Sequence, residues 1–224
     1  MTTVAAVIAR SPALAGRRGN LDFKLVSYHQ FKVEFAQSLR RGSTKMKVTI
    51  HQSTLEIVQG DITQQETEAI GNAANSALAG GGGVDGAIHR AGGPSVMAEL
   101  KAKYKGCPTG SAVITSGGNL KAKYVIHAVG PRYSGSPKDP ELLAGAYRKS
   151  LELCTQNKIA SIAFPSISTG IYGYPVEEAS RIALKTVMDY LKDHPEIKLV
   201  RFVLFDTRTF DVYKKSLKEI APPH

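Results

Sequence analysis

Apolar and polar positions alternate along the chain from Met46 onward, first with the period of strands and then with the period of helices. Short apolar or alternating runs predict strands at 47–50, 55–58, 69–72, 112–115, 124–129, 161–164 and 199–205. Amphipathic or proline-initiated segments predict helices at 84–91, after Pro94, at 142–155, from Pro175 and at 210–220. This order predicts an α/β fold: a three-layer α/β/α domain over residues 46–224, with a central mixed sheet of about six or seven strands.

The composition is that of one ordinary globular domain, with 42% hydrophobic and 21% charged residues in a chain of 224. The formal net charge of +10 is unevenly distributed. Residues 1–45 hold eight basic and two acidic side chains, which is +6, and residues 46–224 hold the remaining +4. The basic excess belongs mainly to the N-terminal segment, so it gives little reason to expect a polyanion partner for the domain.

The two cysteines, Cys107 and Cys154, form no CxxC motif and have no histidine pattern beside them. This spacing argues against a zinc site and a disulfide scaffold, and it favours a reducing compartment. We therefore expect a cytoplasmic protein. No apolar run approaches the roughly 20 residues that span a bilayer, so we expect no membrane partner.

Residues 1–45 form a basic N-terminal extension without a clear pattern of strands or helices. We expect weak order there, or a stretch translated ahead of a natural start at Met46. The first 21 residues contain three arginines and no acid, which is also typical of organelle-targeting presequences. An organelle location is therefore the alternative to a cytoplasmic one, whereas Arg10 interrupts the apolar run that a secretory signal needs.

Four consecutive glycines, Gly80 to Gly83, stand between the third strand and the first helix. The run from Gly81 to Gly86 matches the dinucleotide-binding pattern G-x-G-x-x-G, but it lies about eight residues beyond the strand and lacks the expected acidic partner. No Gly-Lys-Ser/Thr follows, which excludes a Walker loop. Glycine N–H groups beside a helix start can still bind an anion, so the loop predicts a phosphate site; a mobile linker is the alternative.

Asp85 and His89 are four residues apart on the helix after the glycine loop, so their side chains share one face. A carboxylate can orient a water there, and an imidazole can orient a substrate or carry a proton. The alternatives are a helix-capping carboxylate and a core histidine. Asn72 and Asn75 precede the loop, and we expect all four polar side chains to meet in one cleft.

A second loop, residues 164–173, offers small hydroxyls, two glycines and successive N–H groups before the helix at Pro175. Such a segment can form a concave nest for a second phosphate. Neither loop contains a basic side chain, so we expect backbone dipoles to bind the anion. That arrangement suits a diphosphate that is held rather than cleaved.

Six motifs follow one another along the chain: Gly60-Asp61-Ile62-Thr63, Asn72-Ala73-Ala74-Asn75, Gly80 to Arg90, Cys107-Pro108-Thr109-Gly110, His127-Ala128-Val129-Gly130-Pro131 and Ile167 to Pro175. Together they resemble the macrodomain family, and within it the MacroD-type branch, which includes bacterial O-acetyl-ADP-ribose deacetylases. The resemblance covers about residues 46–220 and implies that residues 46–224 form a macrodomain. It does not extend to residues 1–45.

The resemblance implies substrate-binding roles for residues in each motif. Asp61 is similar to the family's acceptor for the adenine amino group, with Ile62 beside it, and Phe205 to the aromatic residue that stacks on adenine. A solvated turn carboxylate and a core phenylalanine are the alternatives for Asp61 and Phe205. The other substrate-binding residues are Asn72, which braces the loop, Asn75 at the distal ribose, Gly82, Gly83 and Val84 at the α-phosphate, and Ser168, Thr169, Gly170, Ile171 and Tyr172 in the second phosphate loop.

Asp85 resembles the family's catalytic carboxylate, with His89 and Tyr172 shaping the distal ribose pocket. The implied enzyme is a hydrolase in which a water between Asp85 and a diphosphate oxygen attacks its substrate. The attack falls either on O-acetyl-ADP-ribose, giving ADP-ribose and acetate, or on the anomeric carbon of a mono-ADP-ribosylated acidic side chain. The resemblance implies no metal and no cofactor.

Two other functions stay open. Many macrodomains only bind, so a non-catalytic ADP-ribose reader is one alternative, although Asp85 and His89 favour catalysis. A regulatory partnership with a ribonuclease, ribonuclease III, is the other, because some bacterial relatives are reported to have it. The expected partners are otherwise ADP-ribose, O-acetyl-ADP-ribose and mono-ADP-ribosylated proteins.

Two glycines depart from the family pattern. Gly71 stands where an apolar β-branched residue is usual, and Gly92 stands where alanine is usual. The change at Gly71 removes a core side chain, which we expect to loosen the strand under the binding loop at a cost of roughly 1–3 kcal/mol.

Overall fold

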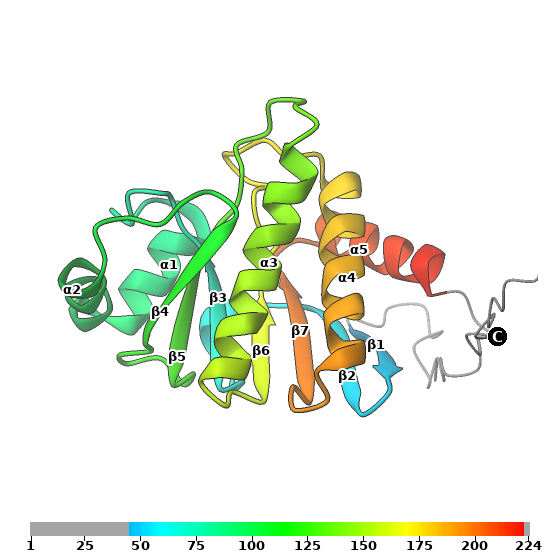
Figure 1. Cartoon of the computed structure of the whole chain (residues 1–224), viewed down its shortest axis with the longest axis horizontal. Helices are drawn as coiled ribbons and strands as arrows, with labels where there is room; N and C mark the ends of the chain where they lie inside the picture. The colour runs from blue at the N-terminus through cyan, green and yellow to red at the C-terminus, as the bar shows by residue number, and fades with distance from the viewer. Residues whose placement is uncertain (1–44, 222–224) are drawn as a thin grey trace, which may run out of the picture. The chain divides into compact units, whose positions relative to one another are not determined.

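The computed structural model of the chain describes residues 45–221 (Figure 1). Its strands are β1 (Lys45–Ile50), β2 (Ser53–Gln59), β3 (Ala69–Ala73), β4 (Ser111–Ser116), β5 (Tyr124–Val129), β6 (Ser161–Phe164) and β7 (Leu199–Leu204). Its helices are the short 3-10 helix η1 (Ile62–Gln64), α1 (Gly83–Gly92), α2 (Pro94–Lys103), α3 (Asp139–Gln156), α4 (Val176–Asp193) and α5 (Thr207–Ile220). Apart from Lys45, the N-terminal extension predicted at 1–45 lies outside the described residues. Within residues 45–221, none of the helices combines the length and apolar character needed to traverse a bilayer.

The strands form one mixed sheet in the order β1-β2-β7-β6-β3-β5-β4. The five inner strands run parallel, and the edge strands β1 and β4 pair antiparallel with β2 and β5. The α/β fold and the mixed sheet are therefore confirmed, with seven strands. The inner strands are covered on both faces, which explains why three successive residues of β6, Ile162 to Phe164, are apolar and buried without alternation.

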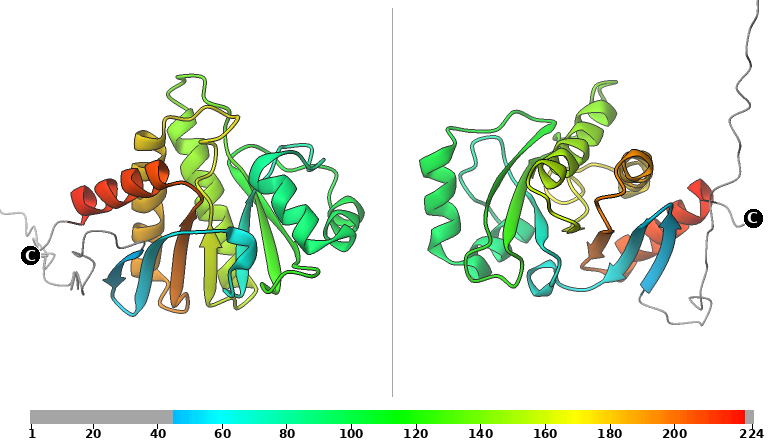
Figure 2. Two further views of the ribbon diagram at one scale, coloured as in Figure 1. Left: turned by 180° about the vertical axis from the view of Figure 1, so that it is seen from behind. Right: turned by 60° about the horizontal axis from the view of Figure 1, so that its bottom comes forward.

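Helices cover both faces of the sheet (Figures 1 and 2). The main core lies between the sheet and α3, α4 and α5, and it contains Leu143 and Tyr213. A smaller core on the opposite face joins Ile88 of α1 to Ile70 of β3. Ile70 and its neighbour Ala69 belong to different cores, because successive side chains of a strand point to opposite faces.

Three helix starts differ from their predicted positions. α5 begins at Thr207 rather than at 210, because the Asp206 carboxylate accepts a 2.8 Å hydrogen bond from the Thr209 N–H. α3 begins at Asp139 rather than at 142, and the Asp139 carboxylate accepts from the Ser134 N–H at 2.8 Å. Pro175 is the N-cap of α4 and not its first helical residue.

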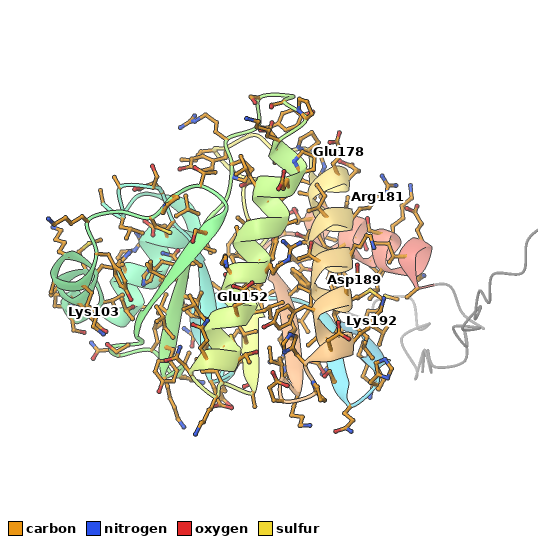
Figure 3. All side chains as sticks on the ribbon, viewed as in Figure 1. Lys103, Glu152, Glu178, Arg181, Asp189 and Lys192 are labelled. Carbon is orange, nitrogen blue, oxygen red and sulfur yellow. The ribbon has the colours of Figure 1, made fainter. Side chains whose placement is uncertain are left out.

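Charged side chains pair along the solvent side of α4 (Figure 3). Asp189 accepts from Lys185 and from Lys192, both at 2.7 Å, and Arg181 reaches Glu219 of α5 at 2.9 Å. Exposed pairs of this kind contribute about 0–1 kcal/mol each. The buried apolar face of α4, not these pairs, is therefore what holds the helix on the sheet.

Gly71 leaves no void in β3, contrary to the expectation from the sequence. A Cβ at Gly71 would lie 2.6 Å from Cδ1 of Phe164, so the ring of the neighbouring strand β6 already fills the space. A Cβ at Gly92 would likewise lie 2.8 Å from Cγ2 of Val96. The expected loss of core packing at Gly71 is wrong, because a larger side chain on the adjacent strand supplies the volume.

Candidate functional site

The candidate site is a cavity of about 630 Å³ at the carboxyl ends of the central strands. β3 leads to α1 on one face of the sheet, and its neighbour β6 leads to α4 on the other face. Two adjacent strands whose connections leave toward opposite faces open a crevice, which is where α/β proteins commonly bind ligands. The strand order therefore determines where the cavity lies.

The glycine loop forms one wall of this cavity through Gly81, Gly82 and Gly83. Gly83 has a φ of +56°, which side chains rarely allow, and it begins α1 without a side-chain cap at the preceding residue. The first N–H groups of α1 are thus suited to an anion. Asn75 braces the loop, since its Nδ2 donates to the Gly80 carbonyl at 2.8 Å and its Oδ1 accepts from the Ala79 N–H at 3.2 Å.

The second loop forms the opposite wall and is anchored by two buried tyrosines. The Tyr147 hydroxyl donates to the Pro165 carbonyl at 3.2 Å and accepts from the Ile167 N–H at 3.0 Å. The Tyr213 hydroxyl lies 2.9 Å from Ser166 Oγ. Burial raises the pKa of Tyr213 to about 12 and the pKa of Tyr147 well above its ordinary value, so both hydroxyls keep the protons that these bonds use.

Gly130, at the end of β5, allows the second loop to come close. A Cβ at Gly130 would overlap the side chains of Ile167 and Ser168. Ser168 has a φ of +67°, and its buried Oγ has no hydrogen-bond partner among the described residues. A strained residue with an unpartnered hydroxyl on a cavity wall is suited to binding a ligand.

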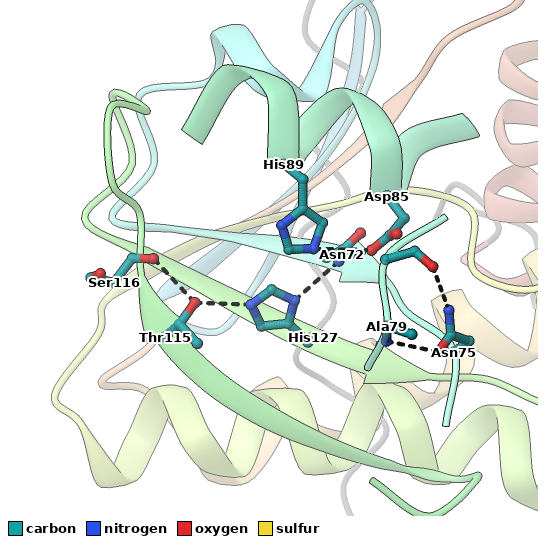
Figure 4. Close-up of polar contacts among 9 residues, drawn as sticks. Asn72, Asn75, Ala79, Asp85, His89, Thr115, Ser116 and His127 are labelled. Atoms are coloured by element: carbon teal, nitrogen blue, oxygen red, sulfur yellow. Dashed lines mark hydrogen bonds and ion pairs between the residues drawn. The ribbon is translucent and has the colours of Figure 1, made fainter. Parts of the chain in front are cut away.

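Asp85 is a buried carboxylate in the first turn of α1, on the cavity wall (Figure 4). Its Oδ1 accepts a 2.6 Å hydrogen bond from Asn72 Nδ2 and lies 3.5 Å from His89 Nε2. Its Oδ2 is buried and has no partner in the described part of the chain. A carboxylate oxygen in this state can accept a hydrogen bond from a water or a substrate hydroxyl.

His127 lies behind Asn72 on the neighbouring strand β5 (Figure 4). Its Nδ1 is 3.0 Å from Asn72 Nδ2, and its Nε2 is 2.9 Å from Thr115 Oγ1. Burial, together with the nearby His89, lowers the pKa of His127 to about 3. The imidazole is therefore neutral at pH 7, and it contacts the site through Asn72.

Asp61 and Phe205 follow adjacent strands, since the Gly60 N–H donates to the Leu204 carbonyl at 2.9 Å. Both side chains line the cavity, and Phe205 is 85% exposed, so it is not a core residue. The Asp61 carboxylate also accepts a 2.8 Å bond from the Thr63 N–H. The Asp61 carboxylate, a hydrogen-bond acceptor, and the exposed ring of Phe205 are thus both present on the cavity wall.

Tyr172 is held at the rim by the loop that follows β5. The Tyr133 N–H donates to the Tyr172 carbonyl at 2.9 Å, and the Arg132 guanidinium carbon lies 5.0 Å from the centre of the Tyr172 ring. Ile171, beside it, is 88% exposed. These contacts orient the Tyr172 ring without burying it.

The structure brings most of the predicted site residues to the cavity, but not all of them. The lining includes Asp61, Ile62, Asn75, Gly82, Gly83, Val84, Asp85, Ser168, Thr169, Gly170, Ile171, Tyr172 and Phe205. Asn72 and His89 do not line it and instead contact Asp85 from behind. No three His, Cys, Asp or Glu side chains within residues 45–221 are grouped as a metal site.

Arg90 also lines the cavity, although the sequence predicted no role for it. Binding of the anion by backbone dipoles stays a prediction, and Arg90 of α1 adds a cationic side chain to the cavity wall beside the two loops. Its position in the sequence, one helical turn after Gly86, could have indicated this placement, because Gly86 has no side chain to block the guanidinium. Arg90 Nη1 lies 3.0 Å from where a Gly86 Cβ would stand.

The chain is similar to proteins of one family. The family model described as Macro domain matches residues 71–183. The O-acetyl-ADP-ribose deacetylase of Cronobacter turicensis is 54% identical over 167 residues, 73% of this chain and 95% of the relative. The ADP-ribose glycohydrolase MACROD2 of Xenopus laevis is 53% identical over 167 residues, 73% of this chain and 40% of that protein. The solved Oceanobacillus iheyensis macrodomain with ADP is 47% identical with a TM-score of 0.75, covering 79% of this chain and 96% of that chain.

Proposed function

The chain belongs to the macro domain family, and on that premise we propose that it is a hydrolase that binds ADP-ribose and cleaves ADP-ribose esters. Its substrates are O-acetyl-ADP-ribose, which it converts to ADP-ribose and acetate, and proteins mono-ADP-ribosylated on acidic side chains. The observation that carries this proposal is Asp85, a buried carboxylate on the cavity wall with one oxygen held by Asn72 and the other unpartnered.

The lining residues support one direction of binding. Asp61 and the exposed ring of Phe205 offer an acceptor and a stacking face for adenine. The diphosphate then lies between the glycine loop and the second loop, where Arg90 adds a positive charge. The distal ribose, which carries the ester, comes to lie near Asp85 and Tyr172.

The reaction uses a water held by Asp85 Oδ2 and by a diphosphate oxygen of the substrate. Attack on O-acetyl-ADP-ribose forms a bond from the water oxygen to the ester carbonyl carbon. The bond from that carbon to the ribose oxygen then breaks, acetate leaves, and the ribose oxygen receives a proton. On a modified protein the water attacks the anomeric carbon, and the bond to the side-chain carboxylate breaks. Positioning of the water contributes more than strong basicity.

Turnover assays with both substrates test this function. We expect the wild type to hydrolyse at least one of them, and Asp85→Ala to lower kcat by roughly a hundred-fold or more while ADP-ribose still binds. Asp211→Ala is the matched control, because this exposed carboxylate of α5 pairs only with Lys214 at 3.2 Å in the described chain and does not line the cavity. Binding without turnover by the wild type would instead identify a non-catalytic ADP-ribose reader.

A partnership with ribonuclease III and a cytoplasmic location stay predictions from the sequence. If the chain binds RNA, we expect that binding to weaken steeply with salt and to disappear when residues 1–45 are deleted, because six of the ten net positive charges belong to that segment.

A further inference from the structure

Three buried polar side chains form a row across the face of the sheet that α1 covers (Figure 4). Thr115 of β4, His127 of β5 and Asn72 of β3 are at most 2% exposed. Asn72 and His127 are partners in the β3–β5 register. Other positions on this face are apolar, such as Ile70 and Val125. A polar row inside an apolar layer is costly unless each group is paired, so its hydrogen bonds need to be traced atom by atom.

The Asp85 carboxylate, which is hydrogen-bonded to Asn72, determines which atoms of the row donate and which accept. Asp85 Oδ1 can only accept, so the Asn72 atom 2.6 Å away is the amide nitrogen. The second N–H of that amide points to His127 Nδ1 at 3.0 Å, which must therefore accept. The proton of His127 is then on Nε2 and is donated to Thr115 Oγ1 at 2.9 Å. The Thr115 hydroxyl in turn donates to the Ser116 carbonyl at 3.1 Å.

The other tautomer of His127, with its proton on Nδ1, is unfavourable whichever way the Asn72 amide is turned. A proton on His127 Nδ1 would face the N–H groups of Asn72. Rotating the Asn72 amide would relieve that contact but would place its oxygen against Asp85 Oδ1, so two acceptors would meet. Because Asn72 donates to Asp85, His127 must donate to Thr115.

We propose that Thr115 and His127 are positioning residues for Asp85. The Asp85 carboxylate sets the direction of the hydrogen bonds. Thr115 holds the His127 ring by accepting from its Nε2, and His127 Nδ1 holds the Asn72 amide, so that the amide stays bonded to Asp85 Oδ1 and Oδ2 stays directed at the substrate water. Oδ2 lies next to the glycine loop, 3.4 Å from where a Cβ of Gly81 would stand. This inference rests on the proposed hydrolase function and adds to it two residues that do not line the cavity.

Two other titratable side chains face the row without sharing its hydrogen bonds. His89 of α1 stacks on His127 with ring centroids 5.8 Å apart, and its Nε2 lies 3.5 Å from Asp85 Oδ1. Glu99 of α2 accepts from the Ser116 N–H at 2.9 Å. Both ring nitrogens of His127 are taken by Asn72 and Thr115, so neither neighbour sets its tautomer.

Thr115→Val tests the row, because it removes the hydroxyl and nearly keeps the shape. We expect kcat for the ADP-ribose ester to fall roughly ten- to a hundred-fold, with KM and the Kd for ADP-ribose within about two-fold of the wild type. Thr115→Ser, which restores a hydroxyl, should recover most of the activity. Ser150→Ala is the control for loss of a buried hydroxyl, since Ser150 Oγ donates to the Ala146 carbonyl at 2.7 Å within α3; its kcat should not change.

The tautomer itself can be observed without substrate. In the wild-type protein, the ¹⁵N spectrum of the His127 ring should show a proton on Nε2 and none on Nδ1 from about pH 5 to pH 8. A proton on Nδ1, or full kcat in a folded Thr115→Val variant, overturns the positioning role. The spectrum is recorded on the wild type, so it tests the tautomer of His127 even if Thr115→Val fails to fold. Failure of the wild type to hydrolyse any ADP-ribose ester would instead overturn the proposed function.

Discussion

At the scale of single residues, Arg90 shows how the absence of one side chain places another. Gly86 precedes it by one helical turn, and Arg90 Nη1 lies 3.0 Å from the place that a Gly86 Cβ would take. The guanidinium therefore reaches back along α1 to the cavity wall. It adds a positive charge beside the N–H groups of the glycine loop, and a diphosphate is the ligand that this combination suits.

Arg90→Ala should weaken ADP-ribose binding by roughly five-fold at low salt, because an exposed charge contributes about 1 kcal/mol. The difference should shrink as ionic strength rises and screening increases. Titration calorimetry at two salt concentrations measures both effects. Arg148→Ala, on the exposed side of α3 and away from the cavity, should bind like the wild type. Equal affinity of Arg90→Ala and wild type at low salt would contradict this role.

At the scale of elements, a large side chain of β6 fills the space left by a glycine of the adjacent strand β3. β3 contributes no side chain at Gly71, and β6 fills that space with the ring of Phe164, which is fully buried. Phe164 also contacts Tyr147 edge to face, with centroids 5.3 Å apart, and Tyr147 anchors the second loop. Phe164 and Tyr147 thereby connect the packing of β3, which leads to the glycine loop, to the position of the second loop.

Gly71→Val should destabilise the protein by about 1–3 kcal/mol, although valine is the kind of residue that the family pattern has there. The reason is overpacking, since the new Cβ would stand 2.6 Å from Phe164 Cδ1. Urea unfolding measures the change in free energy. Gly60→Ala is the control, because a Cβ there meets nothing within 4 Å. Unchanged or higher stability of Gly71→Val would show that the ring of Phe164 moves aside freely.

At the scale of the whole molecule, burial of the polar row makes folding depend on pH. His127 is fully buried and its pKa is lowered to about 3 by that burial, whereas an unfolded histidine has its pKa near 6.5. Between these two values the unfolded chain binds a proton that the folded chain does not. Stability therefore falls as the pH drops below about 6.5 and stops falling, for this group, below about 3.

From pH 7.5 to pH 5 the burial of His127 should cost about 2 kcal/mol of folding free energy. Urea unfolding at both pH values measures this loss. His127→Gln keeps an acceptor and a donor in place of the ring nitrogens but does not titrate, so the loss should be smaller by about that amount. A variant whose stability falls as much as that of the wild type would show that other groups carry the pH dependence.

Patterns along the chain were enough to predict the order of strands and helices, the fold class, the glycine loop and Asp85 with its i, i+4 neighbour His89. These features are local: strand and helix periods extend over a few residues, and a glycine run or a helical spacing can be read directly along the chain. The motif order likewise identified the family that the comparisons confirm. The choice between a core and a stacking position for Phe205 stayed open because it depended on burial.

Which side chains meet depends on how the chain folds in three dimensions. The tertiary structure placed Phe164 beside Gly71, exposed Phe205, brought Arg90 to the cavity, and moved Asn72 and His89 behind the carboxylate. The polar row shows the reason, because Asn72 and His127 are 55 positions apart and meet through the register of β3 and β5. Strand order and register come from packing the whole sheet between its helices, so no local pattern along the chain contains them.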